Sequence, residues 1–185
     1  MISSEGLENY QKYQQRVEVF KTFGYDIQHE REAILEQAQP VNGSILEIGT
    51  GKGYFAIALA QKGCHFTSVD ISEEEQKYAR MNIAYLNLQE YVDFQISDAG
   101  NLKFKDHSFD VIFSVNVLHH LEHPFEAADE MIRVLRKKGK IIISDFSMSG
   151  MDLVDKIHKS EGREHPRGKR SEERRVGKEC RSRRS

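Results

Sequence analysis

Five short apolar runs alternate with helical patterns between residues 44 and 144, and this alternation constrains the fold more than any other feature. The runs cover residues 44–48, 65–69, 92–96, 109–115 and 140–144, and helical patterns at 54–61, 72–86 and 124–136 lie between them. Strands that alternate with helices are typical of βαβ units, whose strands run parallel. The sequence therefore predicts an α/β fold with a doubly wound, mostly parallel sheet.

Local signals place the other helices and their ends. An amphipathic N-terminal helix is predicted because apolar side chains recur at steps of three and four, at Leu7, Tyr10, Tyr13, Val17 and Phe20. Further helices are expected over 29–38 and 151–165. Ser72 and Glu75 predict a reciprocal capping box, and Lys-Lys-Gly at 137–139 predicts a helix end with the glycine at positive φ.

Length and composition narrow the class of protein. A chain of 185 residues suits one domain rather than two. No apolar run approaches the roughly 20 residues of a membrane-spanning helix, and the first residues lack the basic and apolar segments of a signal peptide. Cys64 and Cys180 are too few for a disulfide framework or a four-cysteine zinc site. We therefore expect a cytoplasmic domain with no membrane partner.

Charge is divided unevenly along the chain. Residues 170–185 carry seven basic and three acidic side chains, a net charge of +4, whereas residues 1–169 carry 20 basic and 26 acidic ones, a net charge of −6. The acidic body disfavours an extended nucleic-acid surface, although the basic tail alone could be a nucleic-acid arm. Residues 170–183 also match the in-frame translation of a common sequencing adaptor that begins AGA-TCG-GAA-GAG. We interpret residues 170–185 as a non-native tail and exclude them from fold reasoning.

The segment 45–55 reads Ile-Leu-Glu-Ile-Gly-Thr-Gly-Lys-Gly-Tyr-Phe and joins the first apolar run to a helix. Its three glycines permit a sharp turn and let a ligand approach the main chain closely. A P-loop is excluded because Lys52 is followed by Gly53 rather than by Ser or Thr. A dinucleotide fingerprint is excluded because Tyr54 stands where its third glycine belongs, which leaves a nicotinamide-dependent oxidoreductase as a weak alternative.

Glu47-Ile48-Gly49-Thr50-Gly51-Lys52-Gly53 resembles the first motif of class I S-adenosylmethionine-dependent methyltransferases. Four later segments keep the order of that family: Val69-Asp70, Asp98-Ala99, residues 109–121 and residues 133–141. The resemblance spans residues 45–146, about 100 residues. It implies a Rossmann-like fold, S-adenosylmethionine as cofactor and methyl transfer as activity, in a chain that stops before the family's last two strands.

The resemblance also implies which residues bind the cofactor: Glu47, Gly49, Thr50, Gly51, Gly53, Asp70, Ile71, Asp98, Ala99 and Asn116. Asp70 is expected to accept hydrogen bonds from both ribose hydroxyls. Glu47 is expected to support the shape of the loop close to the ligand, and Lys52 to be solvated. Asp98 and Ala99 are expected beside the adenine, although Asp98 could instead belong to a turn with Gly100.

The sequence does not identify a single catalytic residue, because methyl transfer mainly requires that the enzyme align the methyl donor with the acceptor. His119 and His120 are candidate general bases, and the sequence selects neither. We expect no metal at His119, His120 and His123, because adjacent histidines should point in different directions and further ligands are lacking. Residues 116–119 read Asn-Val-Leu-His, which disfavours the amino-methylating nucleic-acid enzymes and their Asp/Asn-Pro-Pro-aromatic segment.

The expected organisation has four parts. Residues 1–40 form N-terminal helices on the acceptor side, whose aromatic residues serve either packing or a lid. Residues 41–146 form the cofactor-binding core, residues 147–169 begin an acceptor-side region with candidates His158, Arg163 and His165, and residues 170–185 form the tail. The run at 141–143 would then lie at an exposed sheet edge. We expect a small-molecule acceptor, with a non-catalytic cofactor-binding module of the same fold as the alternative.

Overall fold

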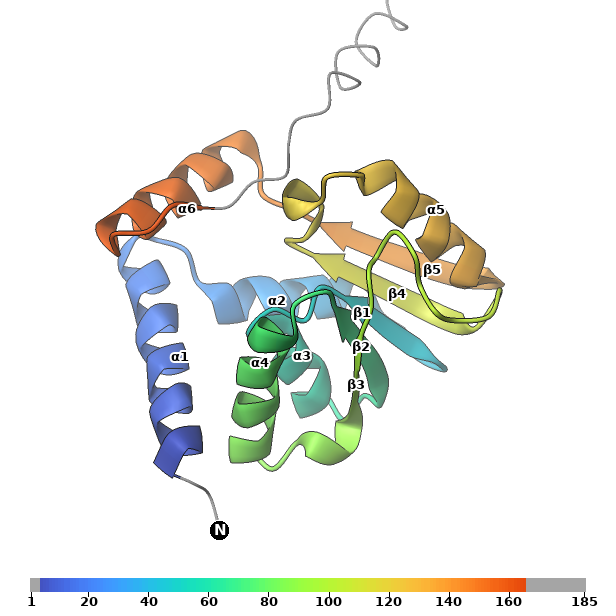
Figure 1. Ribbon diagram of the computed structural model, residues 1–185, viewed down its shortest axis with the longest axis horizontal. Coiled ribbons are helices and arrows are strands. Elements are labelled where there is room, and N and C mark those ends of the chain that lie inside the picture. Colours follow the sequence, from blue (N-terminus) through green and yellow to red (C-terminus); the bar gives the residue numbers. More distant parts are fainter. Residues whose placement is uncertain (1–3, 166–185) are drawn as a thin grey trace, which may run out of the picture.

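The structure of the protein is a computed structural model that describes residues 4–165 (Figure 1). The expected tail at 170–185, with Cys180, lies outside the described residues. Five strands form one parallel sheet: β1 (Ile45–Ile48), β2 (Phe66–Asp70), β3 (Val92–Ile96), β4 (Phe109–Val115) and β5 (Leu135–Ser144). Their order is β3-β2-β1-β4-β5. Strands β2 and β3 therefore lie on one side of β1, and β4 and β5 lie on the other. The predicted α/β, doubly wound, Rossmann-like sheet is confirmed.

Six α-helices accompany the strands in residues 4–165: α1 (Ser4–Thr22), α2 (Ile27–Gln37), α3 (Tyr54–Gln61), α4 (Glu73–Tyr85), α5 (Pro124–Val134) and α6 (Met148–Ser160). Two short 3-10 turns, η1 (Gln89–Tyr91) and η2 (Leu118–His120), follow α4 and β4. Figure 1 shows α5 on one face of the sheet, and α6 beside the junction of α1 and α2. All helices expected from the sequence are present, within a few residues at their ends.

Alternate residues of the strands point to opposite faces of the sheet and form two cores. Ile45, Phe113 and Val115 pack under α2 and α3 in one core, and Leu46, Ile48 and Ile112 pack under α5 in the other. A third buried cluster joins α1, α2 and α6 through Val17, Phe20, Ile27, Val154 and Ile157. The N-terminal helices and α6 are therefore held to each other by a small core of their own.

Two local predictions need correction. α5 ends at Val134 and residues 135–144 continue as β5, so Lys-Lys-Gly at 137–139 is strand and not a helix end. Gly139 is not at positive φ; it is needed because an added Cβ would lie 2.7 Å from the carbonyl oxygen of Asp110. Only half of the capping box forms: the Ser72 hydroxyl accepts from the Glu75 amide, but the Ser72 amide donates to Asp70 Oδ1 at 2.9 Å.

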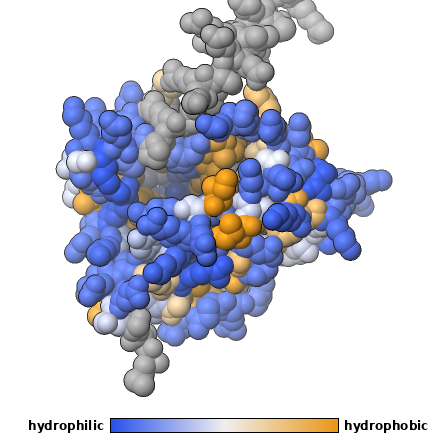
Figure 2. Space-filling model, in the orientation of Figure 1, coloured by the Kyte–Doolittle hydropathy of each residue, from blue (hydrophilic) through white to orange (hydrophobic). Residues whose placement is uncertain are grey.

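β5 is an edge of the described sheet, as expected, because it pairs with β4 on one side only. Its residue Ile143 is 48% exposed. The face seen in Figure 2 is mostly hydrophilic, with a small hydrophobic group near its centre. Among the described residues, no helix combines the length and the apolar character that a bilayer crossing demands.

Candidate cofactor and acceptor site

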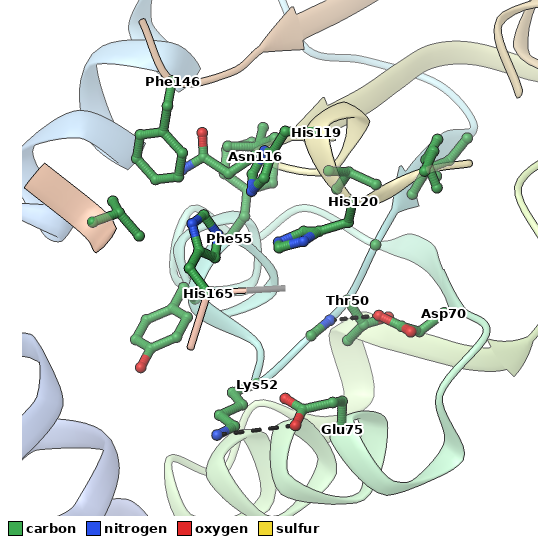
Figure 3. Close-up of a pocket in the computed structure, with 18 of the residues that line it drawn as sticks. Thr50, Lys52, Phe55, Asp70, Glu75, Asn116, His119, His120, Phe146 and His165 are labelled. Carbon is green, nitrogen blue, oxygen red and sulfur yellow. Dashed lines mark hydrogen bonds and ion pairs between the residues drawn. The ribbon is translucent and has the colours of Figure 1, made fainter. Parts of the chain in front are cut away.

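A cavity of about 640 Å³ opens at the carboxyl ends of β1, β2 and β4. One side, here named the glycine wall, is made of residues 49–51 with Asp70 and Ile71. The opposite side, named the histidine wall, is made of His119, His120 and His165. Figure 3 shows the three histidine side chains together, above Thr50 and Asp70. A cavity at the point where the strand order reverses is the usual ligand position in a doubly wound sheet.

The glycine wall depends on backbone conformations that glycine alone adopts readily. Gly49 has φ +82° and an added Cβ would lie 2.3 Å from Val117 Cγ2. Gly51 has φ +48°, and an added Cβ there would meet no protein atom within 4 Å. The Gly51 amide donates a hydrogen bond of 2.7 Å to Asp70 Oδ2, which ties the loop to the end of β2. Gly49 thus allows close packing beneath the loop, and Gly51 leaves its upper surface open to a ligand.

The structure gives Gly53 a packing role, and the cofactor contact implied by the resemblance stays a prediction. It is not among the described residues that line the cavity. Its φ is +87°, and an added Cβ would lie 3.0 Å from the Cβ of Ala79 in α4. Gly53 therefore lets α3 start close against α4, and its contribution to the cavity is through that packing.

Glu47 lies beneath the loop and is also absent from the described cavity lining. Its Oε2 accepts a hydrogen bond of 2.5 Å from the Ser68 hydroxyl, which lies 2.6 Å from the Thr50 hydroxyl. Gln76 completes this buried network by donating to Thr50 Oγ1 and to the Ser68 carbonyl. Burial raises the pKa of the Glu47 carboxyl to about 8. Glu47 thus supports the loop from below, as the sequence favoured, and does not reach the cavity.

Asp70 uses both carboxylate oxygens to accept backbone amides, from Gly51 at 2.7 Å and from Ser72 at 2.9 Å. A carboxylate has about four lone-pair positions, so each oxygen retains one for a ligand hydroxyl. The neighbouring Ile71 also lines the cavity, and its side chain is 71% exposed. This pair offers an acceptor for two hydroxyls and an apolar surface for a flat ring.

Asp98, Ala99 and Asn116 line the cavity as the sequence predicted. Asp98 Oδ1 accepts from the Gly100 amide at 2.9 Å, so the turn considered as an alternative is present. Asn116 has φ +57°, a conformation that asparagine tolerates better than most residues. Its side-chain amide lies 3.4 Å from the Tyr25 hydroxyl on the N-terminal side. The turn at Asp98 leaves its second carboxylate oxygen for a ligand, and the adenine contact stays a prediction.

The histidines are closer together than the sequence indicated. The rings of His119 and His120 lie 3.9 Å apart between centroids, so the premise that adjacent histidines point apart is wrong here. His123 is remote from them; it is exposed and lies 3.9 Å from Glu126. Its place is taken by His165, whose ring lies 5.1 Å from that of His119. Residue 165 is far from residue 119 in the sequence, and the two rings meet because the chain after α6 folds back onto η2.

Lys52 and the N-terminal aromatic residues have mixed roles. Lys52 lines the cavity but is paired with Glu75 at 3.9 Å, so it is more than a solvated side chain. Tyr10 and Tyr13 stack on Tyr85 and Tyr54 with centroids 4.4 and 4.9 Å apart, which confirms the packing interpretation for them. Phe20 in the same helix lines the cavity.

Arg31 is a cavity residue that the sequence analysis missed. It is 7% exposed, on the buried face of α2 between Ile27 and Leu35. The spacing of residues 27, 31 and 35 could have identified it, because positions four apart share one face of a helix. Burying a cation on such an apolar face costs free energy unless the cation is paired, so its presence there indicates a specific role. Its guanidinium is paired with Glu30, and it brings a positive charge to the cavity.

These residues fit the cofactor that the resemblance implies. A ribose would find the Asp70 oxygens, an adenine would find Ile71 and Ala99, and the methionine carboxylate would find the cation of Arg31. The open space above Gly51 leaves room for the ligand to pass close to the backbone.

Comparison with known proteins agrees with a cavity that binds S-adenosylmethionine. Residues 46–143 match the family model described as a methyltransferase domain. The chain is 34% identical over 125 residues, 67% of its length, to a demethylmenaquinone methyltransferase of Clavibacter sepedonicus, and the match spans 50% of that relative. A solved SAM-dependent methyltransferase from Aquifex aeolicus superposes with a TM-score of 0.57 at 25% identity, covering 63% of this chain and 64% of that one.

The crystal structure of the [4+2]-cyclase SpnF also superposes, with a TM-score of 0.58 and 25% identity over 62% of this chain and 43% of that one. The chain belongs to the methyltransferase domain family, whose cofactor is S-adenosylmethionine.

Proposed function

We propose that the protein transfers a methyl group from S-adenosylmethionine to a small-molecule acceptor that enters beside the histidine wall. One observation carries this proposal: the glycine wall and the histidine wall face each other across a single cavity of about 640 Å³. That volume lies in the range of small-molecule sites. The acidic body of residues 1–169 and the acceptor named in the C. sepedonicus relative favour a small molecule over a nucleic acid.

The chain's own residues divide the work between the two walls. Asp70 and Ile71 would hold the nucleoside, and the bound cofactor supplies an electrophilic methyl group. His119 is oriented by Asp145, whose Oδ1 lies 2.5 Å from Nδ1 of the ring. The Nε2 atom of His119 is buried without a hydrogen-bond partner in the described residues. An acceptor hydroxyl or amine would donate to that nitrogen, which fixes the acceptor's position and can hold its proton.

The contrast with His120 favours His119 among the two candidates from the sequence. His119 has a buried side chain, 9% exposed, and a carboxylate that fixes its orientation. The hydrogen bond from His119 lowers the pKa of Asp145 even though burial of that carboxyl acts in the opposite direction. His120 is exposed at the mouth of the same wall.

A non-catalytic cofactor-binding module of the same fold is the second candidate. SpnF superposes on this chain and its structure is that of a cyclase, so the fold alone does not fix methyl transfer as the activity. The chain also spans half the length of the C. sepedonicus relative. Methyl transfer to any acceptor would separate the two candidates.

Calorimetry tests the first step of the proposal. We expect S-adenosylhomocysteine to bind one site per chain and NAD to give no heat. Tight NAD binding would overturn the assignment. With demethylated quinones as trial acceptors, His119→Asn is expected to lower kcat while S-adenosylhomocysteine affinity is unchanged; unchanged kcat would contradict the role of His119.

One expectation about location and one about partners accompany this function. The cytosolic location is predicted from the sequence. Nucleic acid is not expected to bind, and deletion of residues 170–185 should remove any salt-sensitive affinity for RNA or DNA. Salt-sensitive binding by residues 1–169 would contradict the small-molecule proposal.

A further inference from the structure

The histidine wall has the features of a metal site in addition to those of an acceptor site. His119, His120 and His165 each offer one ring nitrogen, and these three atoms lie within 4.8 Å of one another. They come from η2 and from the segment after α6, so the tertiary fold assembles them. Three imidazoles with an open fourth position are the ligand set of catalytic zinc sites.

Carboxylates hold two of the rings in the orientation that a metal requires. Asp145 Oδ1 lies 2.5 Å from His119 Nδ1, and Asp155 Oδ1 lies 3.1 Å from His165 Nδ1. Metal-bound histidines commonly donate their other ring nitrogen to such a carboxylate, which fixes the tautomer and makes the ligating nitrogen more basic. In both rings, therefore, Nε2 is the nitrogen left for a metal.

Burial supplies the second, independent observation. His119 and His165 side chains are 9% and 5% exposed, and His119 Nε2 is a buried nitrogen with no hydrogen-bond partner among the described residues. An unpaired buried polar atom of this kind is costly and calls for an explanation.

The neighbouring His158 is excluded as a ligand. Its ring lies 4.8 Å from that of His165, but its Nε2 lies 2.9 Å from the guanidinium of Arg16 and accepts from it. Among residues 4–165 the set is therefore these three rings, and all three line the cavity (Figure 3).

We propose that His119, His120 and His165 form a zinc site whose open coordination position faces the cavity. Tetrahedral zinc with Zn–N distances of about 2.0–2.1 Å places its ligand nitrogens roughly 3.4 Å apart, so each ring moves by about an ångström to close the site. Imidazole ligands suit zinc among the common divalent ions, and magnesium would prefer oxygen. The inference rests on the proposed function only in its last step and changes that step: with Zn²⁺ bound, Nε2 of His119 is a metal ligand, and an oxygen or nitrogen of the acceptor is held as the fourth ligand in place of a hydrogen bond to that nitrogen.

The test uses the full chain, freed of metal with EDTA and titrated with Zn²⁺ against a chromophoric chelator. We expect one Zn²⁺ per chain. His120→Ala should weaken binding at least about tenfold by removing a ligand, and this exposed position is the least demanding for folding. Asp145→Asn should weaken it by about 10–100-fold through the loss of the supporting carboxylate.

Two matched controls locate the site. His123→Ala removes an exposed histidine of the same segment, outside the cluster, and should bind Zn²⁺ as the wild type does. Cys180→Ser removes the thiol of the tail and should also leave the affinity unchanged. Absence of stoichiometric Zn²⁺ binding, unchanged affinity in His120→Ala, or loss of binding in Cys180→Ser overturns the proposal.

Failure of this proposal and failure of the proposed function give different results. Calorimetry with S-adenosylhomocysteine is done on the same EDTA-treated protein. If S-adenosylhomocysteine binds and Zn²⁺ does not, only the zinc site is overturned. If Zn²⁺ binds at the three histidines and S-adenosylhomocysteine does not, the zinc site is supported and the proposed function is overturned.

Discussion

The two walls of the cavity are built in opposite ways. The glycine wall is local: Gly49, Gly51 and Asp70 occupy the ends of two adjacent strands, and a hydrogen bond of 2.7 Å joins them. The histidine wall is assembled from distant segments, since His119 and His165 lie 46 positions apart in the chain. The residues of the glycine wall therefore form a recognisable motif in the sequence. The residues of the histidine wall are separated in the sequence and come together only in the folded protein.

The largest effect is expected at the glycine wall, from Gly49→Ala. The new Cβ would lie 2.3 Å from Val117 Cγ2, on a residue with φ +82°. We expect the free energy of unfolding to fall by about 3 kcal/mol through overpacking and backbone strain, with loss of S-adenosylhomocysteine binding. Gly51→Ala is the control: it also has positive φ but meets no atom, and should lose only about 1 kcal/mol. Urea denaturation measures both, and equal losses would contradict the difference in packing.

The next effect separates the walls by function. Asp70→Ala removes the acceptor for the ribose hydroxyls and the tie to the Gly51 amide. We expect S-adenosylhomocysteine affinity to fall about 100-fold, equivalent to roughly 2.7 kcal/mol, with Zn²⁺ affinity unchanged. Calorimetry with each ligand measures the two. A parallel loss of both affinities would show that the two walls are energetically coupled, and would contradict their independence.

A pH effect is expected from Glu47 beneath the loop. Its pKa is raised by burial from 4.5 to about 8, so the folded chain binds this proton more tightly than the unfolded chain does. Stability from this group is therefore complete below about pH 4.5 and is lost as the pH rises to 8. Glu47→Gln should remove this decline and be more stable than the wild type at pH 8.5, by a few kcal/mol. Identical pH profiles of thermal unfolding for both proteins would contradict it.

The smallest effect concerns the attachment of the histidine wall. Glu161 follows α6 and pairs with Arg16 of α1 at 3.1 Å, with side chains 21% and 16% exposed. Exposed ion pairs contribute about 0.2–1 kcal/mol, and we expect this partly buried pair to lie at the upper end of that range. We expect Glu161→Gln to lower the free energy of unfolding by no more than that and to leave S-adenosylhomocysteine affinity unchanged. A loss of several kcal/mol in chemical denaturation would show that α6 is held mainly by this pair and not by Val154 and Ile157.

The sequence predicted what depends on short-range pattern. Strand positions, parallel order and the glycine wall followed from apolar runs and glycine spacing, because each is set by neighbours within a few residues. The end of α5 was mispredicted because Leu135 already pairs with Phe109 of β4, so the chain enters the sheet directly after Val134, and residues 136–139 form an irregularity in the register before Lys140 pairs with Val111. Arg31 was not recognised as a cavity residue, and His165 was named as an acceptor-side candidate without its contact to His119, since both reach the cavity through the packing of α2 and of the segment after α6.

The edge strand β5 has two unlike halves, and this asymmetry governs where another strand can join. Lys137, Lys138 and Lys140 occupy its first half, and cations repel an incoming strand, whereas 141–143 are three isoleucines. An added strand would therefore enter at the half that leads to Asp145. Asp145 orients His119, so strand addition at this edge would be transmitted directly to the histidine wall.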